Sequence, residues 1–134
     1  MIVSCARSLI RNWEKTRGGT IKLGRMFVKN AAQRAQFQPD RMGKSTLASG
    51  DYLFAGLNSF EAGQEHAPHV HEGQDKLYFV LEGAGEIQIG DETQRMGPGD
   101  AALAKSGVVH AIRNPGPERL IVMTVMGPPP AKRG

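Results

Sequence analysis

Cysteine and long apolar runs are both scarce in this sequence. The 134 residues include one cysteine, Cys5, so no internal disulfide can form, and a disulfide-stapled secreted fold is excluded. A lone thiol near the N-terminus is also a poor candidate for a catalytic nucleophile. No apolar run approaches the roughly 20 residues that a membrane-spanning helix needs. We therefore expect a protein of the reducing cytoplasm, without a membrane span.

Acidic residues are nearly missing from the first quarter of the chain. Residues 1–34 contain eight Lys or Arg and a single acid, whereas the remaining residues contain nine basic and twelve acidic side chains. The net charge of +4 therefore combines a strongly basic N-terminal segment with a mildly acidic remainder. We divide the chain accordingly into a basic arm at residues 1–25 and a folded domain at residues 26–134.

The arm has the pattern of a short amphipathic helix, which Gly18-Gly19 would end. Such a helix could pack on the domain, touch a membrane surface or bind an acidic partner, and the arm could also be an extension ahead of a start at Met26. Neither an aromatic platform nor a groove-reading helix accompanies the charge, so we expect no nucleic-acid partner. The apolar residues at helical spacing are Ala6, Leu9, Ile10 and Trp13.

Short apolar runs separated by turn residues follow the arm. Gly, Pro, Asn and Asp between the runs supply the positive or fixed φ values of tight turns, and no long helical period occurs after residue 19. This regular alternation predicts an all-β fold, either a sandwich or a barrel. The strands are expected at residues 52–57, 77–81, 86–89, 101–104, 108–112 and 120–126.

One short motif near the start of the domain suggests a different chemistry. Gly43-Lys44-Ser45 has the ending of a phosphate-binding loop. That loop needs a glycine at position 38, which is Gln38, and a buried strand before it, which residues 33–40 do not supply. We interpret the three residues as a polar turn.

Histidine is concentrated at two places in the predicted domain. His69 and His71 are two residues apart, so on an extended strand both imidazoles project to the same side. His110 lies within a β-branched run at residues 107–112, which is typical of another strand. If the two strands are neighbours, three imidazole nitrogens converge, as they do in metal sites.

The glycines around these histidines complete a longer pattern. The first motif reads Gly63-x5-His69-x-His71-x4-Lys76-x6-Gly83, and the second reads Gly99-x5-Lys105-x-Gly107-x2-His110-x3-Asn114, with 15 residues between them. Their order and spacing resemble the cupin family over roughly residues 51–126. The resemblance implies a single jelly-roll β-barrel, with His69, His71 and His110 inside it as ligands of one divalent transition-metal ion.

Two positions depart from the family pattern. Lys105 replaces the usual Pro, and Lys76 replaces the Glu, sometimes Gln, that usually binds the metal. An ammonium cannot coordinate while protonated, and a divalent cation repels it. Three arrangements stay open: three histidines hold the ion while Lys76 anchors an anionic substrate; a one-residue shift brings Asp75 inward as a fourth ligand; or Lys76 displaces the metal and the pocket binds anions alone.

Two further side chains near these motifs are Tyr78 and His66. Tyr78 shares the strand parity of Lys76, so its hydroxyl could donate a hydrogen bond or a proton there, or its ring could simply fill the core. His66 differs, because it stands at an odd offset from His69 and Pro68 interrupts any strand. We expect His66 to be a loop side chain at the mouth of the barrel.

These residues favour a metal-dependent enzyme that acts on a small anionic metabolite, since three neutral ligands and a lysine leave a positive cavity. The set resembles the three-histidine cupin dioxygenases that act on thiols or on hydroxylated aromatic acids, with Fe(II) as the favoured metal. Cu and Mn also fit, and Zn or Ni would favour isomerase or lyase chemistry. The alternative is a non-catalytic cupin that binds or senses a small molecule. Related cupins are commonly homodimers, which we expect here too.

Overall fold

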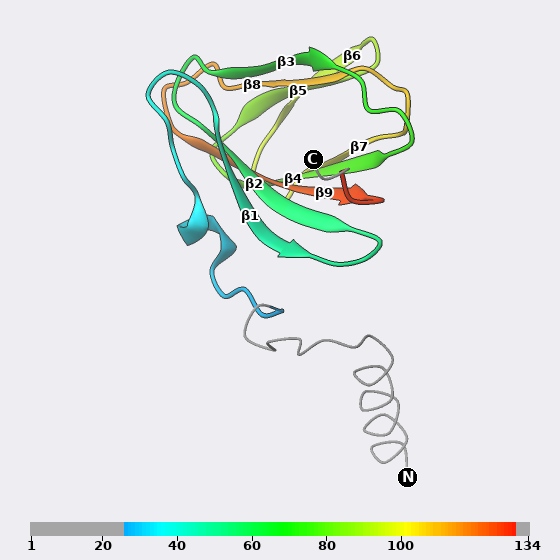
Figure 1. Ribbon diagram of the computed structural model, residues 1–134. Coiled ribbons are helices and arrows are strands. Elements are labelled where there is room, and N and C mark those ends of the chain that lie inside the picture. Colours follow the sequence, from blue (N-terminus) through cyan, green and yellow to red (C-terminus); the bar gives the residue numbers. More distant parts are fainter. Residues whose placement is uncertain (1–25, 131–134) are drawn as a thin grey trace.

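The computed structural model describes residues 26–130 and shows an all-β molecule, which confirms the predicted fold class (Figure 1). In this part of the chain no helix is long and apolar enough to cross a membrane. The basic arm at residues 1–25 lies outside the described residues, so its helix and the boundary at residue 26 stay predictions. The elements are η2 (Ala31–Arg34), β1 (Gly43–Ser49), β2 (Phe54–Phe60), β3 (Glu65–His69), β4 (Asp75–Glu82), β5 (Gly85–Ile89), β6 (Glu92–Met96), β7 (Ala101–Ala104), β8 (His110–Arg113) and β9 (Leu120–Gly127).

The strands form two antiparallel sheets that face each other (Figure 1). One sheet has five strands in the order β1-β2-β9-β4-β7, and the other has four in the order β3-β8-β5-β6. The last strand, β9, lies between β2 and β4, so the chain crosses from one sheet to the other and returns. This arrangement confirms the predicted single jelly-roll barrel.

The interior of the barrel is apolar at one end. Alternate residues along each strand point inward, and Val80 of β4 packs there with Val122 of β9 and Ile112 of β8. Burying an aliphatic side chain of this size contributes about 1.5 to 3 kcal/mol, so this cluster is a main source of stability. The other buried members of the cluster are Phe60, Tyr78, Ile87 and Leu120.

A second apolar cluster lies on the outer face of the five-stranded sheet. Its buried members are Leu47, Leu57 and Ile121, against which residues of η2 and its flanking segments pack. The hydroxyl of Ser45 donates a hydrogen bond to the carbonyl oxygen of Arg34 at 3.0 Å, which ties β1 to the end of η2. The segment before β1 therefore covers the outside of the barrel and leaves the inner face of the sheet free.

Each predicted run overlaps a strand, but the sequence does not predict every strand. The interpretation of Gly43-Lys44-Ser45 as a polar turn is wrong, because these residues begin β1 and pair with β2. β6 lies where no strand is predicted, and β3 begins at Glu65, ahead of Pro68. The three strands β1, β3 and β6 all lie at the edge of a sheet.

Candidate metal centre

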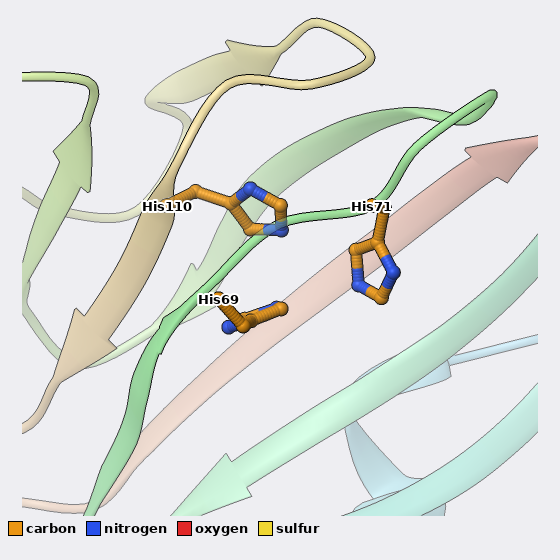
Figure 2. A group of neighbouring side chains, drawn as sticks. All are labelled: His69, His71 and His110. Atoms are coloured by element: carbon orange, nitrogen blue, oxygen red, sulfur yellow. The ribbon is translucent and has the colours of Figure 1, made fainter.

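The three predicted histidines come from two neighbouring strands and the segment after one of them. His69 ends β3 and His110 begins β8, and the two are cross-strand partners. His71 follows β3, where its carbonyl oxygen accepts a hydrogen bond from the N–H of Gly107 at 3.0 Å. Figure 2 shows the rings around one shared space. Their ligand nitrogens all lie within 4.8 Å of one another, so the structure brings the three residues together.

Hydrogen bonds to the backbone fix which ring nitrogen is free. His69 Nδ1 lies 2.7 Å from the carbonyl oxygen of Ala67, and His110 Nδ1 lies 2.8 Å from that of Val108. Because a carbonyl oxygen only accepts, each Nδ1 carries the proton and each Nε2 keeps a free lone pair. Both Nε2 atoms are buried without a hydrogen-bond partner among the described residues. Two unpaired acceptors that face one space fit a bound metal ion.

The histidines are held in the neutral form that binds metal. Burial lowers the pKa of His71 to about 4, and the charge of Lys76 contributes to this shift. Burial also lowers the pKa of His69 and the pKa of His110, although their hydrogen bonds to the backbone act in the opposite direction. At pH 7 these imidazoles therefore need lose no proton before they coordinate a cation. Three neutral imidazoles suit a divalent first-row transition ion.

Lys76, and not Asp75, points into the barrel. Lys76 is only 4% exposed, whereas Asp75 is exposed and its Oδ1 accepts a hydrogen bond from the N–H of Ser106 at 2.9 Å. The one-residue shift that would turn Asp75 inward as a fourth ligand is therefore not present. Burial lowers the pKa of Lys76 to about 8, with a smaller contribution from Lys44. Lys76 thus keeps its positive charge at pH 7.

Tyr78 lies beside Lys76 on the inner face of β4. Its side chain is fully buried, and Lys76 Nζ lies 5.0 Å from the centre of its ring. The ring is also 5.9 Å from that of His110, measured between centroids. Burial raises the pKa of the hydroxyl, so Tyr78 stays protonated at neutral pH. The hydroxyl is buried and has no hydrogen-bond partner among the described residues.

His66 belongs to the site, and the expectation of a loop side chain is wrong. It lies in β3 opposite Ile112, and its ring stacks on that of His69 at a centroid distance of 4.0 Å. The pairing of β3 with β8 shifts register between His66 and His69. This bulge brings side chains three residues apart onto one face, which regular alternation would not do. Burial lowers the pKa of His66 to about 3.

Three of the histidines open into a cavity of about 520 Å³ between the two sheets. His66, His69 and His71 line it from one side, and Lys44 and Lys76 line it from the five-stranded sheet. No Asp or Glu occurs among the described residues of its wall. The charged side chains of the described wall are therefore all basic, which suits an anion. Other polar residues in the wall are Ser45, Thr46, Asn58 and Thr124.

Residues 56–126 match the family model of the cupin domain. The chain belongs to the cupin family. The matched range runs from β2 to β9, so it contains the three histidines, Lys76 and Tyr78 of this cupin. Lys44, on β1, lies ahead of it.

The chain is also similar to a curated protein and to solved structures. An uncharacterized protein of Streptomyces coelicolor is 34% identical over 77 residues, which are 58% of this cupin and 71% of the relative. The crystal structure of a protein from Thermus thermophilus has a TM-score of 0.74 and 32% identity, and the match covers 77% of this chain and 98% of that one. KdgF from Halomonas sp. has a TM-score of 0.68 and 27% identity, with coverages of 78% and 94%.

Proposed function

We propose that this cupin is a metal-dependent enzyme for a small anionic metabolite, and that its reaction is that of a three-histidine dioxygenase. The observation that carries the proposal is the pair of buried, unpartnered Nε2 atoms of His69 and His110, which cluster with His71. His69 and His71 of this cluster line a cavity whose described wall has no carboxylate. Three neutral ligands leave the charge of a divalent ion uncompensated, and Lys76 adds to it. An anionic substrate would restore the balance.

The three imidazoles would hold one divalent transition ion, with Fe(II) favoured and Zn, Ni, Cu or Mn as alternatives. A ferrous ion with open coordination positions would supply oxidative chemistry on an organic anion with dioxygen, whereas Zn or Ni would supply the Lewis-acid chemistry of an isomerase or lyase. The choice of metal therefore decides between these reaction classes.

The side chains around the histidines would bind and orient the substrate. Lys76 is buried and positively charged at pH 7, so its Nζ would form a charge-assisted hydrogen bond with a substrate carboxylate. The hydroxyl of Tyr78, which has no partner among the described residues, would donate a hydrogen bond or a proton to a substrate oxygen. Phe60 and Val80, both 0% exposed, would keep water out behind the substrate.

Metal content tests the centre directly. We expect protein purified without chelator to carry about one first-row transition ion per chain. His71→Ala should lose most of it, because a coordination sphere of four or more positions has only three histidine ligands here, and the loss of one weakens binding strongly. His66→Ala is the matched control: it lines the same wall outside the three-histidine cluster and should keep its metal. A chain that accepts no Fe(II), Zn, Ni or Cu would instead indicate a non-catalytic cupin that binds or senses an anion.

Oxygen consumption tests the reaction class. The Fe(II)-loaded protein would be mixed with air-saturated buffer and a panel of thiol-containing and hydroxylated aromatic carboxylic acids. We expect oxygen uptake with at least one of them, and none with the Zn-loaded protein or with His71→Ala. If no acid caused oxygen uptake but the Zn-loaded or Ni-loaded protein converted one of the acids to a product, the isomerase or lyase alternative would be favoured.

We also propose that this cupin works as a homodimer in the cytoplasm. Leu77 of β4 and Leu103 of β7 are cross-strand partners that are 37% and 50% exposed. They lie where β7 forms an edge of the five-stranded sheet. An exposed apolar pair beside an unpaired edge favours association between two chains. Light scattering should then give twice the mass of one chain.

A further inference from the structure

Asn58 has a buried hydrogen-bond donor that no described residue uses. The residue is 5% exposed and lines the cavity from β2. Its Nδ2 atom has no hydrogen-bond partner within the described part of the chain. A buried donor without an acceptor carries a free-energy penalty, so native structures rarely keep one without a reason. An acceptor on a molecule that enters the cavity would remove this penalty.

Lys44 stands next to Asn58 on the neighbouring strand. The two residues are Cα partners in the pairing of β1 with β2, so their side chains share one face of the sheet. Lys44 lines the same cavity from the edge strand, where it is exposed to the entering ligand.

The two lysines of the cavity stand three strands apart in the same sheet. Lys44 lies on β1 and Lys76 on β4, with β2 and β9 between them. Adjacent strands are about 4.8 Å apart, so the backbones of β1 and β4 are separated by roughly 14 Å along the sheet. In the described wall of the cavity no carboxylate neutralises either lysine. The cavity therefore has two cationic anchors and room for a molecule between them.

We propose that Lys44 and Asn58 form a second anion-binding subsite on the same wall of the cavity as Lys76, at the far edge of the five-stranded sheet, and that the ligand is a small molecule with an anionic oxygen group at each end. This inference rests on the proposed function, in which one anionic group of the same molecule binds at Lys76 and the histidines. The ammonium of Lys44 and the amide N–H of Asn58 together donate to the second group, which is a charge-assisted arrangement. A ligand with one anionic group leaves this subsite empty.

Calorimetric titrations with simple carboxylates test the subsite. The metal-loaded full-length protein would be titrated with malonate, succinate and glutarate, and with acetate, propionate and butyrate. We expect at least one dicarboxylate to bind more tightly than every monocarboxylate, and Lys44→Met to weaken that dicarboxylate by about tenfold while changing monocarboxylates by less than about twofold. Lys29→Met, which removes an exposed lysine outside the cavity wall, should change neither. Equal weakening of both classes by Lys44→Met, or no weakening, would overturn the subsite.

Asn58→Leu tests the amide separately. The shape of the side chain is kept and the donor is removed, so we expect weaker binding of the preferred dicarboxylate, by about fivefold, with an unchanged melting temperature. This pairing of results distinguishes a binding role from a structural one. A large drop in melting temperature with unchanged dicarboxylate affinity would show that Asn58 supports the fold and would remove it from the subsite.

The same titrations on chelator-treated protein separate this inference from the proposed function. Failure of the metal centre would appear as a chain that cannot be loaded, or as monocarboxylate binding that Lys76→Met leaves unchanged. The subsite has its own signature, which is the difference between dicarboxylate and monocarboxylate affinity that Lys44→Met removes. That difference in affinity should persist in the metal-free protein. If it were absent from both the metal-loaded and the metal-free protein, the subsite would be wrong while the metal centre could still be right.

Discussion

The interior of the barrel has a closed end, which is the apolar cluster around Val80, and an open end, which is the cavity lined by Asn58, Lys76 and three of the histidines. A buried asparagine is hydrogen-bonded at the first and, within the described part of the chain, unpartnered at the second. At the closed end Asn114 is fully buried, and its Nδ2 donates to the carbonyl oxygens of Phe60 at 3.2 Å and Glu118 at 2.8 Å. Its Oδ1 accepts a hydrogen bond from the N–H of Gly116 at 2.9 Å. At the open end Asn58 is nearly as buried, but its Nδ2 has no partner among the described residues.

The same difference appears along a single strand. β4 places Lys76 at the open end and Val80 at the closed end, with Tyr78 between them. Val80 packs into an apolar cluster, whereas Lys76 is a buried charge and the hydroxyl of Tyr78 has no hydrogen-bond partner among the described residues. Satisfied groups at the closed end stabilise the fold. Unsatisfied groups at the open end lower its stability and are expected where a ligand completes them.

Replacing Asn114 should have the largest effect on stability. Asn114→Leu removes three hydrogen bonds and leaves two carbonyl oxygens and one N–H without their partner, so we expect the free energy of unfolding to fall by roughly 3 kcal/mol or more. Asn58→Leu should change it by less than about 1 kcal/mol, because its donor has no partner to lose. Urea unfolding of both variants measures the difference. Similar losses at the two positions would contradict the contrast between the two ends.

Lys76→Met should have the next largest effect, and in the opposite direction. The pKa of Lys76 is lowered by burial from 10.5 to about 8, so the folded chain disfavours the charged form relative to the unfolded chain. A difference of that size corresponds to an upper limit of about 3 kcal/mol. We expect metal-free Lys76→Met to be roughly 2 kcal/mol more stable than the natural chain at pH 7, by urea unfolding.

The pH dependence of this gain identifies its cause. Below about pH 8 the lysine is protonated in both states, and the natural chain carries the whole penalty of the buried charge. Between about pH 8 and 10.5 the folded chain has lost its proton while the unfolded chain has not, so the natural chain gains stability as pH rises. The advantage of Lys76→Met should therefore shrink across this window. Lys29→Met, at an exposed position, should show no such change.

The parts of the fold that the sequence predicts are those with apolar patterning. The predicted runs at residues 77–81 and 120–126 fall inside β4 and β9, which lie in the middle of the larger sheet. β1 and β6 were missed because edge strands are half-solvated and carry small or charged residues, which leaves no clear alternation. β3 also lies at an edge, which is where a strand tolerates Pro68.

The candidate site divides in the same way. The convergence of His69, His71 and His110 can be predicted from their spacing and from the family pattern, because residues two apart on a regular strand point to the same side. His66 was not, since its inward direction depends on a register shift in the pairing of β3 with β8. Lys44 was missed because its strand was interpreted as a turn. An unpaired hydrogen-bond donor such as Asn58 Nδ2 becomes visible only once tertiary neighbours are known.

The smallest effect is expected at Asp75, on the outward face of the strand that carries Lys76. Its exposed carboxylate accepts a hydrogen bond from the N–H of Ser106, and Asp75→Asn keeps an oxygen that can accept the same bond. We therefore expect unfolding free energy to change by less than about 0.5 kcal/mol and metal content per chain to stay the same. His71→Ala, measured in parallel by elemental analysis, gives the signal of a lost ligand. If Asp75→Asn lost metal to a similar extent, Asp75 would have to turn inward when the ion binds. The open end of the barrel would then have a fourth protein ligand, and the cavity less positive charge for an anion to balance.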